Sequence, residues 1–144
     1  MKHFGDITKL SGYDLRIVDV ITGGSPCQDL SVAGKRAGLA GERSGLFLDM
    51  IRIIREMREH DRSNGRADFN IRPRFVVFEN VPGIFSSNGG RDFQAALTEF
   101  VRIADPNAPT VPMPSNGKWP YAGLLHNDMG TFSIGWRVTS AEFW

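Results

Sequence analysis

Two short apolar runs separated by one helical stretch constrain the fold of this chain most. Residues 17–22 are rich in β-branched side chains and end at Gly23 and Gly24, and residues 75–78 run into Glu79. Runs this short and this apolar are typical of strands buried in a parallel sheet. Between them, apolar residues recur at helical spacing over residues 44–59. The order of these elements predicts a doubly wound α/β sheet.

The remaining segments complete this prediction. Ser44 is the expected N-cap of the first helix, and Ser63-Asn64-Gly65 is a turn signal inside a polar stretch. In chain order we expect a long loop at 25–44, a polar break at 60–73, a loop at 80–90, an amphipathic helix at 92–103, an irregular segment with four prolines at 105–116, and an edge strand within 133–144.

Composition restricts the class of protein without naming a function. The chain has 144 residues, 41% hydrophobic and 23% charged, as expected of one globular domain. Its formal net charge is +1, so charge alone neither supports nor excludes DNA binding. Residues 1–10 lack the apolar core of a signal peptide, and no stretch approaches the ~20 apolar residues of a membrane span. We therefore expect a cytoplasmic protein.

Cys27 is the single cysteine of the chain. It has no second cysteine with which to form an internal disulfide or a Cys-x-x-Cys redox pair, so a thiol-redox function is disfavoured. His3, His60 and His126 lack metal-ligand spacing with Cys27, and we expect no metal site. By itself, a single cysteine is more often an inert buried residue than a nucleophile.

Cys27 and Glu79 both follow a predicted strand, and ligands of doubly wound sheets bind beyond the carboxyl ends of the strands. Pro26 restricts the turn that carries the thiol, and the preceding glycines allow close approach of a ligand. Desolvation at the end of an apolar strand favours a protonated Glu79 that can donate a hydrogen bond. A thiolate and a carboxylic acid suit addition to an electron-poor ring, but their spacing does not identify that ring.

Five blocks identify a family by resemblance. They are Gly24-Ser25-Pro26-Cys27-Gln28-Asp29-Leu30-Ser31 with Ala33-Gly34-Lys35-Arg36-Ala37-Gly38, then Arg43 with Gly45-Leu46-Phe47, Phe78-Glu79-Asn80-Val81-Pro82-Gly83, Gly5-Asp6-Ile7-Thr8, and Gly135-Trp136-Arg137-Val138 through Trp144. They occur in the order typical of cytosine-5 DNA methyltransferases, and the chain resembles that family over nearly its whole length. Pro-Cys-Gln alone is a weak signal, whereas its combination with Glu-Asn-Val is a strong one.

The resemblance implies a DNA (cytosine-5)-methyltransferase with a doubly wound, Rossmann-like sheet, S-adenosylmethionine as cofactor and double-stranded DNA with a flipped cytosine as partner. It implies that the nucleophile Cys27 forms a covalent adduct with cytosine and that Glu79 binds its ring. By the same resemblance, the cofactor contacts are Asp6, Ile7, Gly24, Pro26 and Leu46, the DNA contacts are Ser31, Lys35 and Arg43, and Gln28 and Asn80 support the site.

The family's N-terminal glycine-rich cofactor loop, its Gln-Arg-x-Arg block and its target-recognition region have no counterpart in residues 1–144. We therefore expect a partial catalytic domain, with complementary methyltransferase segments as its partners. The same resemblance implies a bacterial or phage-infected cell. A role in restriction–modification, an orphan role and a role in phage self-protection remain open. The alternative is an inactive remnant, or a fragment that binds DNA without turnover. Exposed sheet edges and apolar faces of such a fragment predict aggregation.

Overall fold

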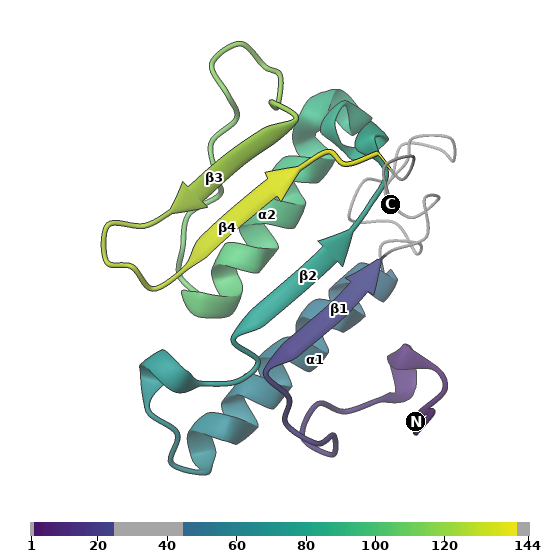
Figure 1. Ribbon diagram of the computed structural model, residues 1–144, viewed down its shortest axis with the longest axis vertical. Coiled ribbons are helices and arrows are strands. Elements are labelled where there is room, and N and C mark those ends of the chain that lie inside the picture. The colour runs from purple at the N-terminus through teal and green to yellow at the C-terminus, as the bar shows by residue number, and fades with distance from the viewer. Residues whose placement is uncertain (1, 25–44, 141–144) are drawn as a thin grey trace. The chain divides into compact units, whose positions relative to one another are not determined.

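The computed structural model describes residues 2–24 and 45–140, which form a mixed α/β structure (Figure 1). The chain divides into two compact units, residues 1–80 and residues 81–144. Within the described ranges, no helix has the length and apolar character needed to cross a membrane. The α/β class predicted from the sequence is confirmed.

The first unit is built on a parallel pair of strands, β1 (Val20–Gly24) and β2 (Phe75–Glu79), connected through helix α1 (Gly45–Ser63) (Figure 1). The parallel pairing is confirmed, but the predicted bounds of the first strand were wrong. β1 begins at Val20 and includes Gly23 and Gly24, which we expected to stop it. A Cβ atom added at Gly23 would lie 2.7 Å from Sδ of Met50, so the glycine lets α1 pack closely against β1.

The two faces of this strand pair differ in burial. On one face, Phe78 packs its ring against Phe47 of α1, with ring centroids 5.2 Å apart. On the other face, Val20, Phe75 and Val77 are 47%, 57% and 57% exposed. Our expectation of strands buried on both faces is therefore wrong for the outer face, because alternate side chains of a strand point to opposite sides and only one side packs on α1.

Helix α1 is the main source of the first unit's core. Its buried side chains recur at three- and four-residue spacing, which is why this stretch forms a helix with one face on the sheet. The helix continues four residues beyond the predicted residue 59, and the expected turn follows at Asn64 and Gly65, where Gly65 has φ +86°. The buried residues of α1 are Phe47, Met50, Ile51, Ile53, Ile54, Met57 and Asp61.

Two short 3-10 helices lie outside this framework. The first, η1 (Ile7–Lys9), belongs to the N-terminal segment that packs on α1, and η4 (Asp68–Asn70) lies between α1 and β2.

The second unit packs an antiparallel hairpin on a helix. It contains η5 (Pro82–Phe85), η6 (Ser87–Gly90), α2 (Arg91–Ala104), β3 (Ala122–His126) and β4 (Ser133–Arg137). The helix predicted at 92–103, the irregular segment at 105–116 and the strand within 133–144 are confirmed. The loop predicted at 80–90 instead holds the two 3-10 helices, and β3 was not predicted.

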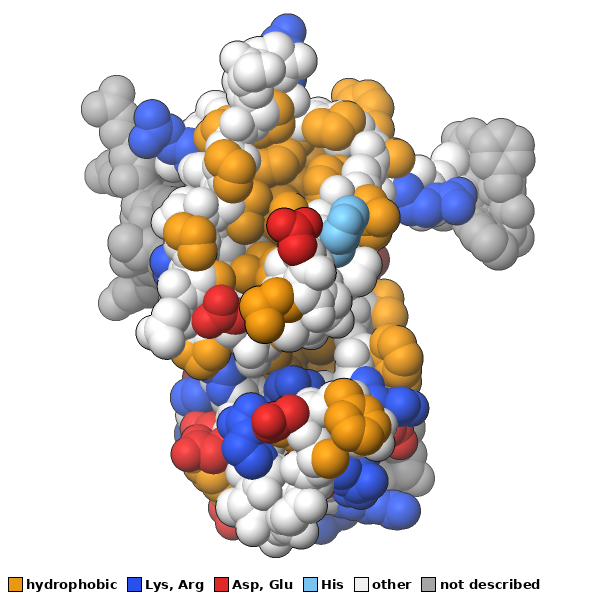
Figure 2. Space-filling model, turned by 90° about the vertical axis from the view of Figure 1, so that its left-hand side faces the viewer, with side chains coloured by type: hydrophobic (Ala, Val, Ile, Leu, Met, Phe, Trp, Pro, Cys, Tyr) orange, Lys and Arg blue, Asp and Glu red, His pale blue; other side chains and the backbone are white. Residues whose placement is uncertain are grey.

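Aromatic side chains hold the second unit together. Phe93 of α2 makes edge-to-face contacts with Trp119 and Trp136, at centroid distances of 5.1 and 5.5 Å. The indole N–H of Trp119 donates to the Gly90 carbonyl at 2.8 Å. Hydrophobic side chains also gather on the surface over the hairpin, where Leu124 is 64% exposed (Figure 2).

Candidate functional site at the carboxyl ends of the strands

The carboxyl ends of β1 and β2 meet at one residue pair, Gly24 and Glu79, which are partners in the parallel register. A Cβ atom added at Gly24 would lie 3.0 Å from Oε2 of Glu79 and 3.3 Å from its carbonyl oxygen. The glycine therefore leaves the space that the Glu79 carboxylate occupies. Sequence reasoning placed Cys27 and Glu79 after the ends of two strands, and the register shows that these strands are neighbours whose ends meet.

Cys27 follows Gly24 by three residues and lies outside the described part of the chain. The same holds for five other predicted site residues: Pro26, Gln28, Ser31, Lys35 and Arg43. Their predicted roles therefore stay predictions. What the structure does describe is the strand end that precedes them in the sequence.

Glu79 is exposed at the end of β2. Among the described residues, none makes a hydrogen bond or an ion pair with its carboxylate. The burial on which we based the expectation of a protonated carboxyl is thus not observed. An exposed carboxylate beside a glycine is instead accessible to a ligand. Asn80, which follows it, is half-buried.

A cavity of about 410 Å³ lies next to this strand end, within the first unit. Ile7, Gly24 and Leu46, three of the predicted cofactor contacts, line it together. Its volume lies in the range of roughly 300–1,000 Å³ that small-molecule sites occupy, and its lining is mostly apolar. The other lining residues are Ile21, Thr22, Gly23, Phe47, Met50, Ile53 and Phe78.

Asp6 precedes the cavity-lining residue Ile7 in the sequence but does not itself line the cavity. It caps η1: its Oδ1 accepts hydrogen bonds from the backbone N–H of Thr8 at 3.0 Å and from the Thr8 hydroxyl at 2.8 Å. Such a cap satisfies a backbone donor at the start of a helical turn. The carboxylate thereby shapes the turn that presents Ile7 to the cavity.

Helical spacing assigned Phe47 and Met50 to the core alone. They are 1% and 8% exposed, so that assignment is confirmed, yet both also line the cavity, together with Ile53, which is 7% exposed. Helical periodicity shows which face of α1 is apolar. It does not show that part of that face borders a cavity, because the position of the N-terminal segment depends on tertiary contacts.

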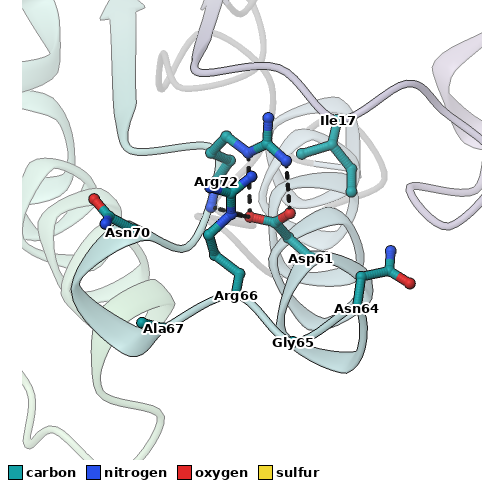
Figure 3. Close-up of a pocket in the computed structure, with 8 residues that line it drawn as sticks. All are labelled: Ile17, Asp61, Asn64, Gly65, Arg66, Ala67, Asn70 and Arg72. Carbon is teal, nitrogen blue, oxygen red and sulfur yellow. Dashed lines mark hydrogen bonds and ion pairs between the residues drawn. The ribbon is translucent and has the colours of Figure 1, made fainter.

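A second cavity, of about 380 Å³, involves the end of α1 and the segments before the strands (Figure 3). Asp61 is its central side chain and is 2% exposed. Arg72 donates to Asp61 from its backbone N–H at 2.9 Å and from its guanidinium at 2.9 and 3.3 Å. Arg66 adds an ion pair at 3.4 Å. The other lining residues are Ile17, Asn64, Gly65, Ala67 and Asn70.

The electrostatics of this second cavity indicate a structural role. The hydrogen bond from the Arg72 side chain, opposed by desolvation and aided by the Arg72 backbone N–H, lowers the pKa of Asp61 to about 2. Since both carboxylate oxygens are engaged by arginine donors, the carboxylate fixes the turn after α1 to the start of β2. Among the residues the structure describes, no group of three His, Cys, Asp or Glu side chains has an arrangement suited to a metal ion.

Comparisons with known proteins agree with this geometry. Residues 1–103 match the family model described as C-5 cytosine-specific DNA methylase. The chain is 36% identical over 99 residues to type II methyltransferase M1.ScrFI of Lactococcus lactis subsp. cremoris, covering 69% of this chain and 22% of that protein. It is 34% identical over 103 residues to DNA (cytosine-5-)-methyltransferase M.ApeKI of Aeropyrum pernix, covering 69% and 18%.

A further relative is matched over nearly the whole chain. It is a protein of Escherichia phage P1 named DNA N-6-adenine-methyltransferase, 29% identical over 166 residues, with 98% of this chain and 20% of that protein covered. The chain thus spans about a fifth of the length of these relatives.

Proposed function

Because the chain belongs to the C-5 cytosine-specific DNA methylase family, we propose that residues 1–144 are a partial catalytic domain of a DNA (cytosine-5)-methyltransferase. The reaction is transfer of a methyl group from S-adenosylmethionine to C5 of cytosine in double-stranded DNA. The observation that carries the proposal is the pairing of Gly24, three residues before Cys27, with Glu79. A thiol and a carboxylate that start from paired strand ends can reach the same small substrate.

In this proposal, β1 and β2 are two strands of a larger doubly wound, Rossmann-like sheet. The helical crossover between parallel strands supports it, since that connection is the building unit of such sheets. The exposed outer face of the pair supports it as well, because parallel sheets are normally covered on both faces. Complementary methyltransferase segments are the partners that supply the cover.

Cys27 and Glu79 carry the covalent chemistry. The target cytosine leaves the duplex stack, since its C6 is otherwise inaccessible. The Cys27 thiolate forms a bond to C6 while Glu79 binds N3 and the exocyclic amine, which stabilises the electron pair delivered to C5. C5 then takes the methyl group as its bond to the sulfonium sulfur breaks, and S-adenosylhomocysteine is the leaving group. Loss of the C5 proton and cleavage of the S–C6 bond restore the double bond of the ring and the thiolate.

The cavity beside Gly24 fits the adenosine part of S-adenosylmethionine, which supplies an electrophilic methyl group when it is bound. Its apolar and aromatic lining suits a flat ring, and its volume suits a small molecule. The residues that hold the cofactor in this proposal are Asp6, Ile7, Gly24, Pro26 and Leu46.

Three residues that lie between β1 and α1 in the sequence contact DNA in this proposal. Ser31, Lys35 and Arg43 bind phosphates, which positions the duplex without reading its sequence. Gln28 and Asn80 support the backbone around the thiol and the carboxylate. Lys35 and Arg43 supply positive charge for the substrate phosphates.

Covalent trapping tests this proposal. The chain is mixed with S-adenosylmethionine and duplex DNA that contains 5-fluorocytosine, and adducts are detected under denaturing conditions. Fluorine at C5 blocks the proton loss that precedes release, so the S–C6 bond persists. Cys27→Ala is the control, and a second arm adds the complementary N- and C-terminal segments of a longer relative.

We expect an adduct that requires Cys27. Its formation by the chain alone assigns the covalent step to these 144 residues, whereas formation only with the added segments assigns the step to a split or truncated enzyme. If folded material gives no adduct in either arm, the proposal fails, and the chain is a remnant or a fragment that binds DNA without turnover.

A second candidate function is methylation of the adenine N6 amine. The match to the phage P1 protein over 98% of the chain favours it. An exocyclic amine attacks the methyl donor directly, so this reaction needs no thiolate addition to the ring. Mass spectrometry of the modified nucleosides separates the two functions. If Cys27→Ala still produces N6-methyladenine, the second candidate is supported. If the wild type produces 5-methylcytosine and Cys27→Ala does not, the first is supported.

A further inference from the structure

The N-terminal segment, residues 5–14, contains no strand and packs on α1 through side chains of that helix. Arg52 of α1 makes the central contacts. Its guanidinium donates to the Leu10 carbonyl at 2.8 Å and to the Ile7 carbonyl at 3.3 Å. These carbonyls belong to the first residue of η1 and to the residue that follows η1, so a single side chain holds both ends of the turn.

Two carboxylates of α1 fix the Arg52 side chain in turn. Asp49 accepts from Nε at 3.1 Å and from one terminal nitrogen at 2.9 Å. Glu56 accepts from the other terminal nitrogen at 3.1 and 3.2 Å. A planar guanidinium held by carboxylates along its helix has little rotational freedom, so it presents its donors to the segment in one orientation.

Glu56 also makes a second attachment of its own. Its Oε2 accepts the backbone N–H of Gly12 at 2.7 Å. A Cβ atom added at Gly12 would lie 2.4 Å from the carbonyl oxygen of Ile53 and 2.9 Å from the backbone nitrogen of Met57. The segment therefore lies against the α1 backbone at a distance that only glycine permits.

These contacts matter for the site because Ile7 lines the 410 Å³ cavity while Arg52 does not. We propose that Arg52, held by Asp49 and Glu56, is a positioning residue that sets the N-terminal wall of the cofactor cavity through the Ile7 and Leu10 carbonyls. The inference rests on the proposed function, since it takes the cavity as the adenosine site. Arg52 itself touches no reacting atom.

Equilibrium binding of S-adenosylhomocysteine, followed by calorimetry, tests the inference on the full chain. Arg52→Gln loses the charged donors, and we expect its dissociation constant to rise about tenfold, the equivalent of one charge-assisted hydrogen bond. Arg52→Lys keeps one donor and should recover part of the affinity. The matched control is Arg62→Gln on the same helix, because Arg62 is 57% exposed and pairs only loosely with Asp68, at 3.6 Å. Its affinity should equal that of the wild type.

Hydrogen exchange supplies a readout that does not depend on the ligand. The amides of Lys9 and Leu10 donate to Asp6 and Ile7 carbonyls, so their exchange reports the order of the turn. We expect faster exchange there in Arg52→Gln and in Gly12→Ala, with α1 itself still protected. Gly12→Ala keeps the Arg52 side chain but forces the segment away from the α1 backbone and from Cβ of Glu56, which would lie 2.8 Å from the added methyl group. It therefore tests the position of the segment if Arg52→Gln folds poorly.

The outcomes separate this inference from the proposed function. Wild-type affinity in Arg52→Gln and Gly12→Ala overturns the inference and leaves the proposed function intact. Faster exchange with unchanged affinity also overturns it, because the contact is then structural only. If the folded wild-type chain binds no S-adenosylhomocysteine, the assignment of the cavity to the cofactor is wrong, and the inference that rests on it fails as well.

Discussion

Asp61 and Glu79 are carboxylates in the same unit, near opposite ends of its parallel strand pair, and they differ in every respect that decides a role. Asp61 is 2% exposed, and its carboxylate pairs with Arg66 and Arg72, which precede β2 in the chain. Glu79 is exposed where β2 ends, and its Oε2 lies next to the open backbone of Gly24. The contrast shows that burial and full pairing identify a carboxylate that holds the fold, whereas an exposed one at a strand end is free for a ligand.

The largest effect should follow from Asp61→Asn. The substitution removes the charge that pairs with Arg72 and Arg66, and loss of one partner of a buried ion pair costs about 3 kcal/mol. Chemical denaturation measures the change in unfolding free energy. Asp68→Asn is the matched control, since Asp68 is 91% exposed, and it should stay within about 0.5 kcal/mol of the wild type. Equal losses of unfolding free energy in Asp61→Asn and Asp68→Asn would mean that burial and pairing do not make Asp61 a stabilising residue.

Acid should reproduce that effect in the wild type. The pKa of Asp61 is lowered to about 2 in the folded chain, below its ordinary value. A lowered carboxyl pKa contributes stability that is complete above the ordinary pKa and is lost as the pH falls from about 4 to about 2. Melting temperatures of the wild type and of Asp61→Asn, measured across this interval, should converge as the pH falls. A constant difference would contradict the assignment.

At the other end of the strands, Gly24→Ala should have a smaller effect. Its Cβ would lie 3.0 Å from a carboxylate oxygen that can rotate away and 3.3 Å from a carbonyl oxygen that cannot. We expect a loss of about 1 kcal/mol, together with displacement of the Glu79 side chain. Gly45→Ala is the control, because nothing lies within 4 Å of its added Cβ. If Gly24→Ala stays folded but forms much less adduct than the wild type, the position of Glu79 matters for the chemistry.

Glu79→Gln should have the smallest effect on folding. An exposed side chain without described partners contributes little, so the unfolding free energy should change by less than about 0.5 kcal/mol. Adduct formation in the trapping experiment should nevertheless be lost, or slowed strongly. A large destabilisation would mean that Glu79 holds the fold as Asp61 does, and the comparison would no longer stand.

The sequence predicted the α/β class and the parallel strands, because the alternation of apolar runs is a local property. It placed Cys27 and Glu79 after strand ends, but the pairing of Gly24 with Glu79 came from the structure. It did not predict the bounds of β1, since a glycine pair continues a strand only where a neighbour such as Met50 fills the space. It did not predict the exposed outer face either, because an apolar run does not reveal what covers it.

The sequence also did not predict which side chains pair across a turn. Asp61 belonged to a stretch that we predicted to be a polar break, and its pairing with Arg72 depends on how the chain folds back after Gly65. The cavity contacts Ile7 and Leu46 came from family resemblance rather than from periodicity. The contact of Arg52 with the N-terminal segment was not visible in sequence, since the acceptors there are backbone carbonyls more than forty residues away.

The register of β1 against β2 determines where this chain tolerates changes in length. An additional residue within 20–24 would shift the pairing by one position, so that Glu79 no longer faces Gly24 and inward side chains turn outward. An additional residue at 67–70, next to η4, lies outside the strand pair and leaves its register unchanged, and the closure entropy of a connection grows slowly with its length. Insertions and deletions should therefore accumulate between α1 and β2, while the strand ends keep a fixed count of residues to the thiol.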